Sequence, residues 1–89
     1  MSWKIEYAAS VQKSVRKLDP PVRGRLRTFL EDRLAKLDNP RQLGTAMQGS
    51  RYRDLWRYRV GDYRILTRID DETIRILVIR IAHRRDIYQ

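Results

Sequence analysis

The chain has 89 residues, which is enough for one domain with a single sheet and two or three helices but not for a second core. It has no cysteine and one histidine, His83, so disulfides and thiolate metal sites are excluded and a protein-built zinc site is disfavoured. Twenty lysines and arginines against eleven acidic residues give a net charge of +9, and a domain this basic is expected to meet a polyanion or an acidic protein.

No apolar run is long enough to span a bilayer, and Lys4 and Glu6 interrupt the stretch in which a signal peptide would need an apolar segment. We therefore expect a cytoplasmic protein with no membrane partner. From Leu43 onward every cation is an arginine, whose planar fork grips phosphate and stays charged when desolvated. A GC-rich genome would also favour arginine codons, but codon usage does not account for the net charge.

The first half of the sequence predicts one strand and two helices. Apolar and charged residues alternate over 3–7, which indicates a short strand, and residues 8–18 show apolar side chains at helical spacing. Asp19-Pro20-Pro21 ends this helix and starts the next, which closes at Asn39-Pro40. The apolar stripe of the second helix consists of Val22, Leu26, Phe29, Leu30, Leu34 and Leu37. The two helices form a hairpin that needs a sheet to pack on.

The second half predicts three strands. Residues 41–50 form a connector anchored by Leu43 and Met47, and residues 55–69 then form a β-hairpin. A polar turn over 70–72 leads into residues 73–81, the most β-branched segment, which indicates a central strand buried on much of both faces. A short polar tail covers 82–89.

The element order β-α-α-β-β-β predicts a single α+β domain over residues 1–89. We expect a mainly antiparallel four-stranded sheet with the two-helix hairpin packed on one of its faces.

The hairpin has two chemically different faces if Gly61 and Asp62 form a two-residue turn. The cross-strand pairs are then Val60 with Tyr63, Arg59 with Arg64, Tyr58 with Ile65, Arg57 with Leu66, and Trp56 with Thr67. Because side chains alternate in strands, one face carries Trp56, Tyr58, Val60, Tyr63 and Ile65, which we expect to be core beneath the helices, and the other carries Arg57, Arg59 and Arg64. Like charges opposite one another cost stability, so a face with three arginines predicts an anion site, most simply for phosphate.

Two motifs together resemble the signature of the RelE-type toxins, in the RelE/ParE superfamily of bacterial toxin–antitoxin systems. They are Val60-Gly61-Asp62-Tyr63-Arg64 and His83-Arg84-Arg85-Asp86-Ile87-Tyr88, and the resemblance covers essentially the whole chain. It implies a ribosome-dependent endoribonuclease that cuts mRNA in the ribosomal A site by attack of the ribose 2′-hydroxyl on the adjacent phosphate. Such an enzyme needs no metal or other cofactor and is neutralised by a cognate antitoxin. Its expected partners are therefore the antitoxin, ribosomal RNA and mRNA.

Carried over from the resemblance, the catalytic positions fall on Arg57, Arg64, Arg84 and Tyr88. We expect Arg64 to stabilise the phosphorane, with Arg84 as a similar candidate that could instead cap the last strand by pairing with Asp86. Arg57 is expected to bind phosphate, because a guanidinium is a poor base at neutral pH. Tyr88 could orient the 2′-hydroxyl, take part in proton transfer or stack on a base.

Arg59, His83 and Arg85 are expected to contribute to RNA binding. His83 is the one side chain that ordinarily titrates near neutral pH, so it is either a proton-transfer group or a neutral structural histidine. The basic surface of the helical hairpin is either simply solvated or docks on ribosomal RNA.

The sequence departs from the family pattern at Leu55, where the well-known form has a second basic residue, and this leaves the general base unassigned. Two alternatives to the nuclease follow. One is a ParE-like toxin that poisons DNA gyrase, for which Arg64, Arg84 and Tyr88 would be replaceable. The other is a catalytically weak relative that mainly binds its antitoxin.

Overall fold

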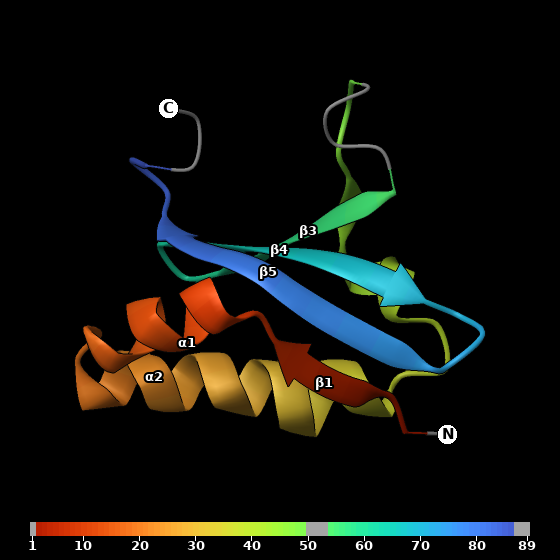
Figure 1. The fold of residues 1–89 in the computed structure, drawn as a ribbon, viewed down its shortest axis with the longest axis horizontal. Helices are drawn as coiled ribbons and strands as arrows, with labels where there is room; N and C mark the ends of the chain where they lie inside the picture. Colours follow the sequence, from red (N-terminus) through yellow and green to blue (C-terminus); the bar gives the residue numbers. More distant parts are fainter. Residues whose placement is uncertain (1, 50–53, 87–89) are drawn as a thin grey trace.

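A five-stranded mixed sheet forms one layer of the structure, and two helices cover one of its faces (Figure 1). The structure is a computed structural model that describes residues 2–49 and 54–86. The strands are β1 (Lys4–Tyr7), β2 (Thr45–Ala46), β3 (Leu55–Val60), β4 (Tyr63–Asp70) and β5 (Arg75–His83). They lie in the order β1-β5-β4-β3-β2, with β1 parallel to β5 and the other neighbours antiparallel. The α+β class is confirmed.

The predicted count of four strands is wrong, because the connector contributes a further edge strand. β2 has only two residues, and it pairs Thr45 with Arg57 and Ala46 with Trp56. Two residues are too few to show the alternation by which strands are recognised in a sequence. The sheet is also mixed through the parallel pairing of β1 with β5, while its larger part is antiparallel as predicted.

α1 (Ala9–Arg16) and α2 (Pro20–Arg27) form the predicted helical hairpin, and Pro20 occupies the first position of the second helix. α2 continues directly into a π-helical segment, η1 (Thr28–Arg33), and a 3₁₀ turn, η2 (Leu34–Lys36). The extent of this second helix follows from the sequence, whereas its wider and tighter turns leave no mark on a 3.6-residue pattern. Among the described residues, no helix has the length and apolar character that a membrane span requires.

The hydrophobic core lies between the helices and the sheet. Its buried members are Val11, Leu26, Leu30 and Leu34 from the helical layer and Tyr58, Ile65, Ile69, Ile76, Val78 and Ile81 from the sheet. Trp56 and Tyr63 pack against this core while remaining partly exposed. The prediction that Trp56, Tyr58 and Tyr63 lie beneath the helices is therefore confirmed, and it leaves the other face of the sheet to carry charge.

The hairpin of β3 and β4 has the predicted register at all five of its expected pairs, from Val60 with Tyr63 to Trp56 with Thr67. Gly61 adopts φ +57°, a left-handed value that hairpin turns of two residues need at their first central position. Since this turn fixes the register, it also fixes which side chains face the helices.

β5 begins and ends two residues later than predicted, so Ala82 and His83 belong to the strand and not to a polar tail. They pair with Arg64 and Tyr63 of β4, so the ladder between β4 and β5 continues beyond the β-branched segment. β5 lies between β1 and β4, and it is buried mainly on the helical side, because its other side exposes arginines. Residues 87–89 of the predicted tail lie outside the described residues.

The connector is held by polar groups and not by Leu43, which is exposed and does not act as the predicted anchor. The chain there forms a 3₁₀ turn, η3 (Pro40–Leu43), and the buried Tyr58 hydroxyl donates a 2.8 Å hydrogen bond to the Pro40 carbonyl. Arg41 forms a bidentate ion pair with Asp71, at 3.0 and 2.7 Å, and its guanidinium lies 5.8 Å from the ring centre of Trp56. Met47, the other predicted anchor, is half-buried, and its amide donates to the Leu55 carbonyl.

Replacing Tyr58 by phenylalanine should lower the free energy of unfolding by about 1–2 kcal/mol, because the Pro40 carbonyl loses its buried donor. Tyr63→Phe is the matched control, since no described residue hydrogen-bonds to its hydroxyl, and it should cost less than about 0.5 kcal/mol. Urea unfolding of the two variants measures the difference. Equal losses would contradict the role given to this hydrogen bond.

The protein should lose stability as the pH rises from about 10 to 12. Burial raises the pKa of Tyr58 to about 12, and burial with the nearby Glu31 carboxylate raises the pKa of Tyr7 to about 12. An unfolded tyrosine ionises near 10, so the unfolded state releases its protons first, and the contribution is complete below pH 10 and lost above it. Urea unfolding at pH 9, 10 and 11 tests this, and a Tyr7→Phe, Tyr58→Phe double variant should show a shallower decline. The prediction would be refuted if the free energy of unfolding of the wild type fell with pH no more steeply than that of the double variant.

Candidate functional site: the arginine face of the sheet

The sheet face opposite the helices carries a group of arginines from three neighbouring strands. The register places Arg57, Leu66 and Arg80 in one row, Arg59, Arg64 and Ala82 in the next, and Leu55, Arg68 and Leu77 in the row on the other side. We call this surface the arginine face and define it by its five cations, which are Arg57, Arg59, Arg64, Arg68 and Arg80. The prediction that Arg57, Arg59 and Arg64 share one face is confirmed.

Leu66 lies at the centre of the arginine face and is itself buried, with 5% of its surface exposed. Arg57 and Arg80 flank it on the neighbouring strands, about 5 Å away in the backbone, and Arg64 and Arg68 flank it along β4 at about 7 Å. The guanidinium groups of Arg57, Arg68 and Arg80 can therefore approach one another above a small apolar floor, and that of Arg64 lies toward the turn end of the same face. Their mutual repulsion disfavours this arrangement unless an anion is bound.

Arg64 is the most constrained member of the arginine face, with only 7% of its surface exposed. Its Nη1 atom donates to the carbonyls of Gly61 and Tyr63, both at 3.1 Å. Carbonyl acceptors fix the orientation of a guanidinium without cancelling its charge, and no carboxylate of the described residues forms an ion pair with Arg64. Arg64 is thus a pre-oriented cation.

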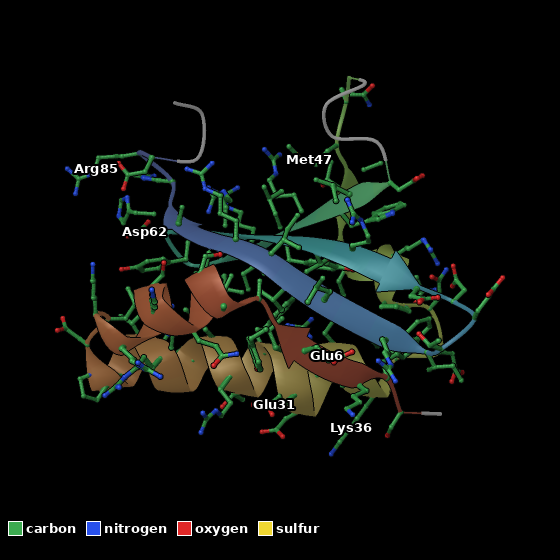
Figure 2. The ribbon with its side chains drawn as sticks, in the orientation of Figure 1. Glu6, Glu31, Lys36, Met47, Asp62 and Arg85 are labelled. Atoms are coloured by element: carbon green, nitrogen blue, oxygen red, sulfur yellow. The ribbon has the colours of Figure 1, made fainter. Side chains whose placement is uncertain are left out.

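The Gly61-Asp62 turn joins three parts of the molecule at one end of the arginine face. The Arg84 amide donates to the Asp62 carbonyl at 2.7 Å, and its Nε atom lies 3.9 Å from the Asp62 carboxylate. Arg84 therefore pairs with Asp62. The alternative in which Arg84 caps the last strand by pairing with Asp86 is wrong. From α2, the Arg25 guanidinium lies so close to the turn that its Nη2 atom would be 2.7 Å from a Cβ on Gly61. Figure 2 shows Asp62 and Arg85 at this same end of the sheet.

His83 faces the helical side of the sheet, away from the arginine face. It pairs with Tyr63 across the ladder, and the two rings meet edge to face with centroids 5.5 Å apart. Its Nδ1 atom accepts a 3.2 Å hydrogen bond from the Arg85 amide, so this nitrogen carries no proton in the arrangement seen. The geometry favours the hypothesis of a structural histidine over that of an RNA-binding or proton-transfer group. Arg85 is exposed just beyond the strand, and Tyr88 lies outside the described residues.

Two members of the arginine face, Arg68 and Arg80, were not among the predicted site residues. Arg68 follows from the same alternation that places Arg64 and Leu66 on this side, so the sequence held the signal for it. Arg68 lies directly across from the buried Leu55. The row that these two residues share therefore has a cation on β4 and none on β3. Arg80 owes its place to an irregularity in β5 that no periodic pattern predicts.

The arrangement can bind a doubly charged phosphate through several guanidinium forks at once. Bidentate arginine–phosphate contacts are strong and directional, and a buried donor such as Arg64 needs little reorganisation. The row positions on β3, β4 and β5 hold neither carboxylate nor imidazole. Glu6 of β1 continues the row of Arg68 and Leu77 on the same side of the sheet, where it pairs with Arg75 at 3.2 Å. The site is therefore built for electrostatic stabilisation.

This fold is that of solved chains named as RelE toxins or as members of RelBE toxin–antitoxin complexes. The structure is similar to a chain of the toxin–antitoxin complex RelBE2 from Mycobacterium tuberculosis, with a TM-score of 0.84 and 24% identity over 97% of this chain and 95% of that chain. It is also similar to the isolated Escherichia coli RelE toxin, with a TM-score of 0.72 and 20% identity over 92% of this chain and 84% of that chain.

Residues 5–88 match the family described as ParE toxin of type II toxin-antitoxin system, parDE, and the chain belongs to this family. Among curated proteins it is 28% identical to Toxin RelG of Mycobacterium tuberculosis, over 100% of this chain and 99% of that protein. The predicted membership of the RelE/ParE superfamily is therefore confirmed.

Alanine at Gly61 should lower the free energy of unfolding by about 1–2 kcal/mol, because its φ of +57° is unfavourable for a residue with a Cβ and the new methyl group must displace Arg25. Gly24→Ala is the opposing control. No atom lies within 4 Å of a Cβ at this position inside α2, so the substitution should raise the free energy of unfolding by about 0.5–1 kcal/mol. Thermal and urea unfolding measure both. Shifts of the same sign would contradict the strain assigned to the turn.

Proposed function

We propose that this toxin is an endoribonuclease that cuts mRNA in the ribosomal A site. The reaction is attack of the ribose 2′-hydroxyl on the adjacent phosphate, which forms a 2′,3′-cyclic phosphate and breaks the bond from phosphorus to the 5′-oxygen of the next nucleotide. The 2′-hydroxyl loses its proton and the leaving 5′-oxygen gains one, in the cytoplasm and without a metal or other cofactor. The observation that carries the proposal is the arginine face, where five cations from three strands lie on the sheet face that has the buried Leu66 at its centre. The likeness to proteins named as RelG and RelE toxins supports it.

Each predicted catalytic arginine has a role suited to its surroundings. Arg64 stabilises the pentacovalent dianion, because a buried donor already held by carbonyls loses little freedom when the charge develops. Arg57 binds the phosphate from the neighbouring strand, since a guanidinium is too weak a base to take the 2′-hydroxyl proton. Arg84, held at the turn by Asp62, adds a further donor at the end of the face, and the exposed Arg59 and Arg85 contact the RNA backbone.

Proton transfer must come from outside the five arginines. His83 faces the opposite side of the sheet, so Tyr88 is the group of this chain that we propose to orient or deprotonate the 2′-hydroxyl. Holding the RNA in line for attack is the other large contribution, and we assign it to the ribosome. The isolated protein is accordingly expected to be a poor nuclease on free RNA.

The proposed partners follow from charge. Ribosomal RNA and mRNA are polyanions that match the +9 chain, and the exposed cations of the helical layer are available for docking on ribosomal RNA. A cognate antitoxin is expected to use an acidic and partly apolar segment, which would fit the arginines together with the leucines between them. The similar chain from Mycobacterium tuberculosis belongs to a toxin–antitoxin complex, which supports an antitoxin as the physiological partner.

The second candidate function is that of a ParE-like toxin that poisons DNA gyrase, and the match to a family named for ParE supports it. The basic surface suits this function as well. It differs from the nuclease in one respect that can be measured, because it gives the phosphate-binding arginines no chemical role.

Mapping of mRNA 5′ ends on translating ribosomes tests the proposal. The wild-type protein should produce cuts at the A-site codon, and Arg64→Ala should reduce the rate about 100-fold or more, the loss expected when a buried oxyanion donor is removed. Because Arg64 is buried, Arg57→Ala serves as a second variant whose partly exposed side chain is less involved in folding. Arg75→Ala removes the same charge from a position paired with Glu6 and should cleave like the wild type.

Two outcomes would overturn the proposed nuclease activity. One is an absence of A-site cuts by a folded, toxic wild-type protein, and the other is undiminished cleavage by both Arg64→Ala and Arg57→Ala. Accumulation of cleaved DNA–gyrase complexes in the absence of mRNA cuts would establish the second candidate in its place.

A further inference from the structure

A β-bulge at Ile79 changes which way the end of β5 faces. Thr67 pairs with Val78, but its neighbour Leu66 pairs with Arg80, so Ile79 is an extra residue with no partner of its own on β4. Val78 and Ile81 are consequently both in the core, three positions apart, with 0% and 8% of their surfaces exposed. Strict alternation from Val78 would have directed Arg80 at the helices. The bulge instead places Arg80 on the arginine face.

The position that Arg80 reaches is opposite Arg57, on the other side of Leu66. Two strand spacings, about 10 Å, separate the backbones of the two arginines, so their side chains approach the space above Leu66 from opposite directions. A phosphate held there would meet one guanidinium from each side. Neither Arg64 nor Arg59 can provide this second direction, because both lie in the neighbouring row.

The guanidinium of Arg80 is oriented by the chain that follows its own strand. Its Nη2 atom donates a 3.1 Å hydrogen bond to the Asp86 carbonyl, and the Asp86 amide donates to the His83 carbonyl at 2.8 Å. One neutral acceptor engages one of the five N–H donors of an arginine and leaves the positive charge uncompensated. Figure 1 shows residues 84–86 leading away from the helices, on the side of the arginine face.

We propose that Arg80 is a further phosphate-binding residue of this site, gripping the RNA opposite Arg57 and held in place by the Asp86 carbonyl. The inference rests on the proposed function for its substrate, which is RNA. It extends the site to β5, a strand whose regular sequence pattern gives no sign of a functional residue.

Salt-dependent binding of a short single-stranded RNA oligonucleotide to the whole chain tests this role apart from catalysis. Each phosphate contact to a single strand contributes about 0.7 to the slope of log K against log salt concentration, so Arg80→Ala should lower the slope by about that amount. Arg80→Gln should do the same, because it keeps a donor for Asp86 but no charge. Arg75→Ala, on the same strand and paired with Glu6, should leave the slope unchanged.

The ribosome assay supplies the second measurement. Arg80→Ala and Arg80→Gln should lower kcat/KM about 10- to 100-fold, the range of one hydrogen-bonded charge contact, and Arg80→Lys should fall between them and the wild type because it keeps the charge without the fork. All three variants should unfold at the wild-type temperature, since the side chain is exposed.

The outcomes separate the two proposals. If the wild type makes no A-site cuts, the proposed function fails, whatever the variants do. If the wild type cuts and Arg80→Ala matches Arg75→Ala in both salt slope and rate, the nuclease stands and the role of Arg80 is overturned. A loss of cleavage with an unchanged salt slope also overturns phosphate binding by Arg80.

Discussion

The register of β3 on β4 is the constraint on which the rest of this structure depends. A two-residue turn at Gly61-Asp62 sets that register, and a slip of one residue would exchange the two faces of the hairpin. In the register seen, Tyr58 and Ile65 are fully buried under the helices, and the arginines of the same strands face the other way. Core and site are thus two results of one pairing.

Much of this could be predicted from the sequence, because alternation and helical spacing are strong signals where they run for six or more residues. The hairpin register, the apolar stripe of α2 and the shared face of Arg57, Arg59 and Arg64 all follow from them. Irregular features did not follow. β2 is too short to show a period, and the π-helical turns of η1 keep an apolar stripe that looks like an ordinary helix.

The facing of the candidate site residues follows from the sequence where they lie on regular strands and does not follow where the strand is irregular. Alternation places Arg64 on the arginine face, whereas the extra residue before Arg80 hides the facing of that arginine. His83 was placed with the RNA-binding residues by its neighbours in the sequence, although pairing with Tyr63 directs it to the opposite face. Adjacency along the chain is therefore a poor guide at the end of β5, where facing is decided by the partner strand.

The bulge at Ile79 also bears on how sequences in this family are compared. If β5 ran without the bulge and Ile79 paired with Leu66, Arg80 would point toward the core and Ile81 toward solvent, although no residue type had changed. Loss of the Ile79 codon would instead leave Arg80 opposite Leu66 in a regular strand. The charge of the face therefore depends on how β5 pairs with β4, and a comparison of residue types alone does not register it.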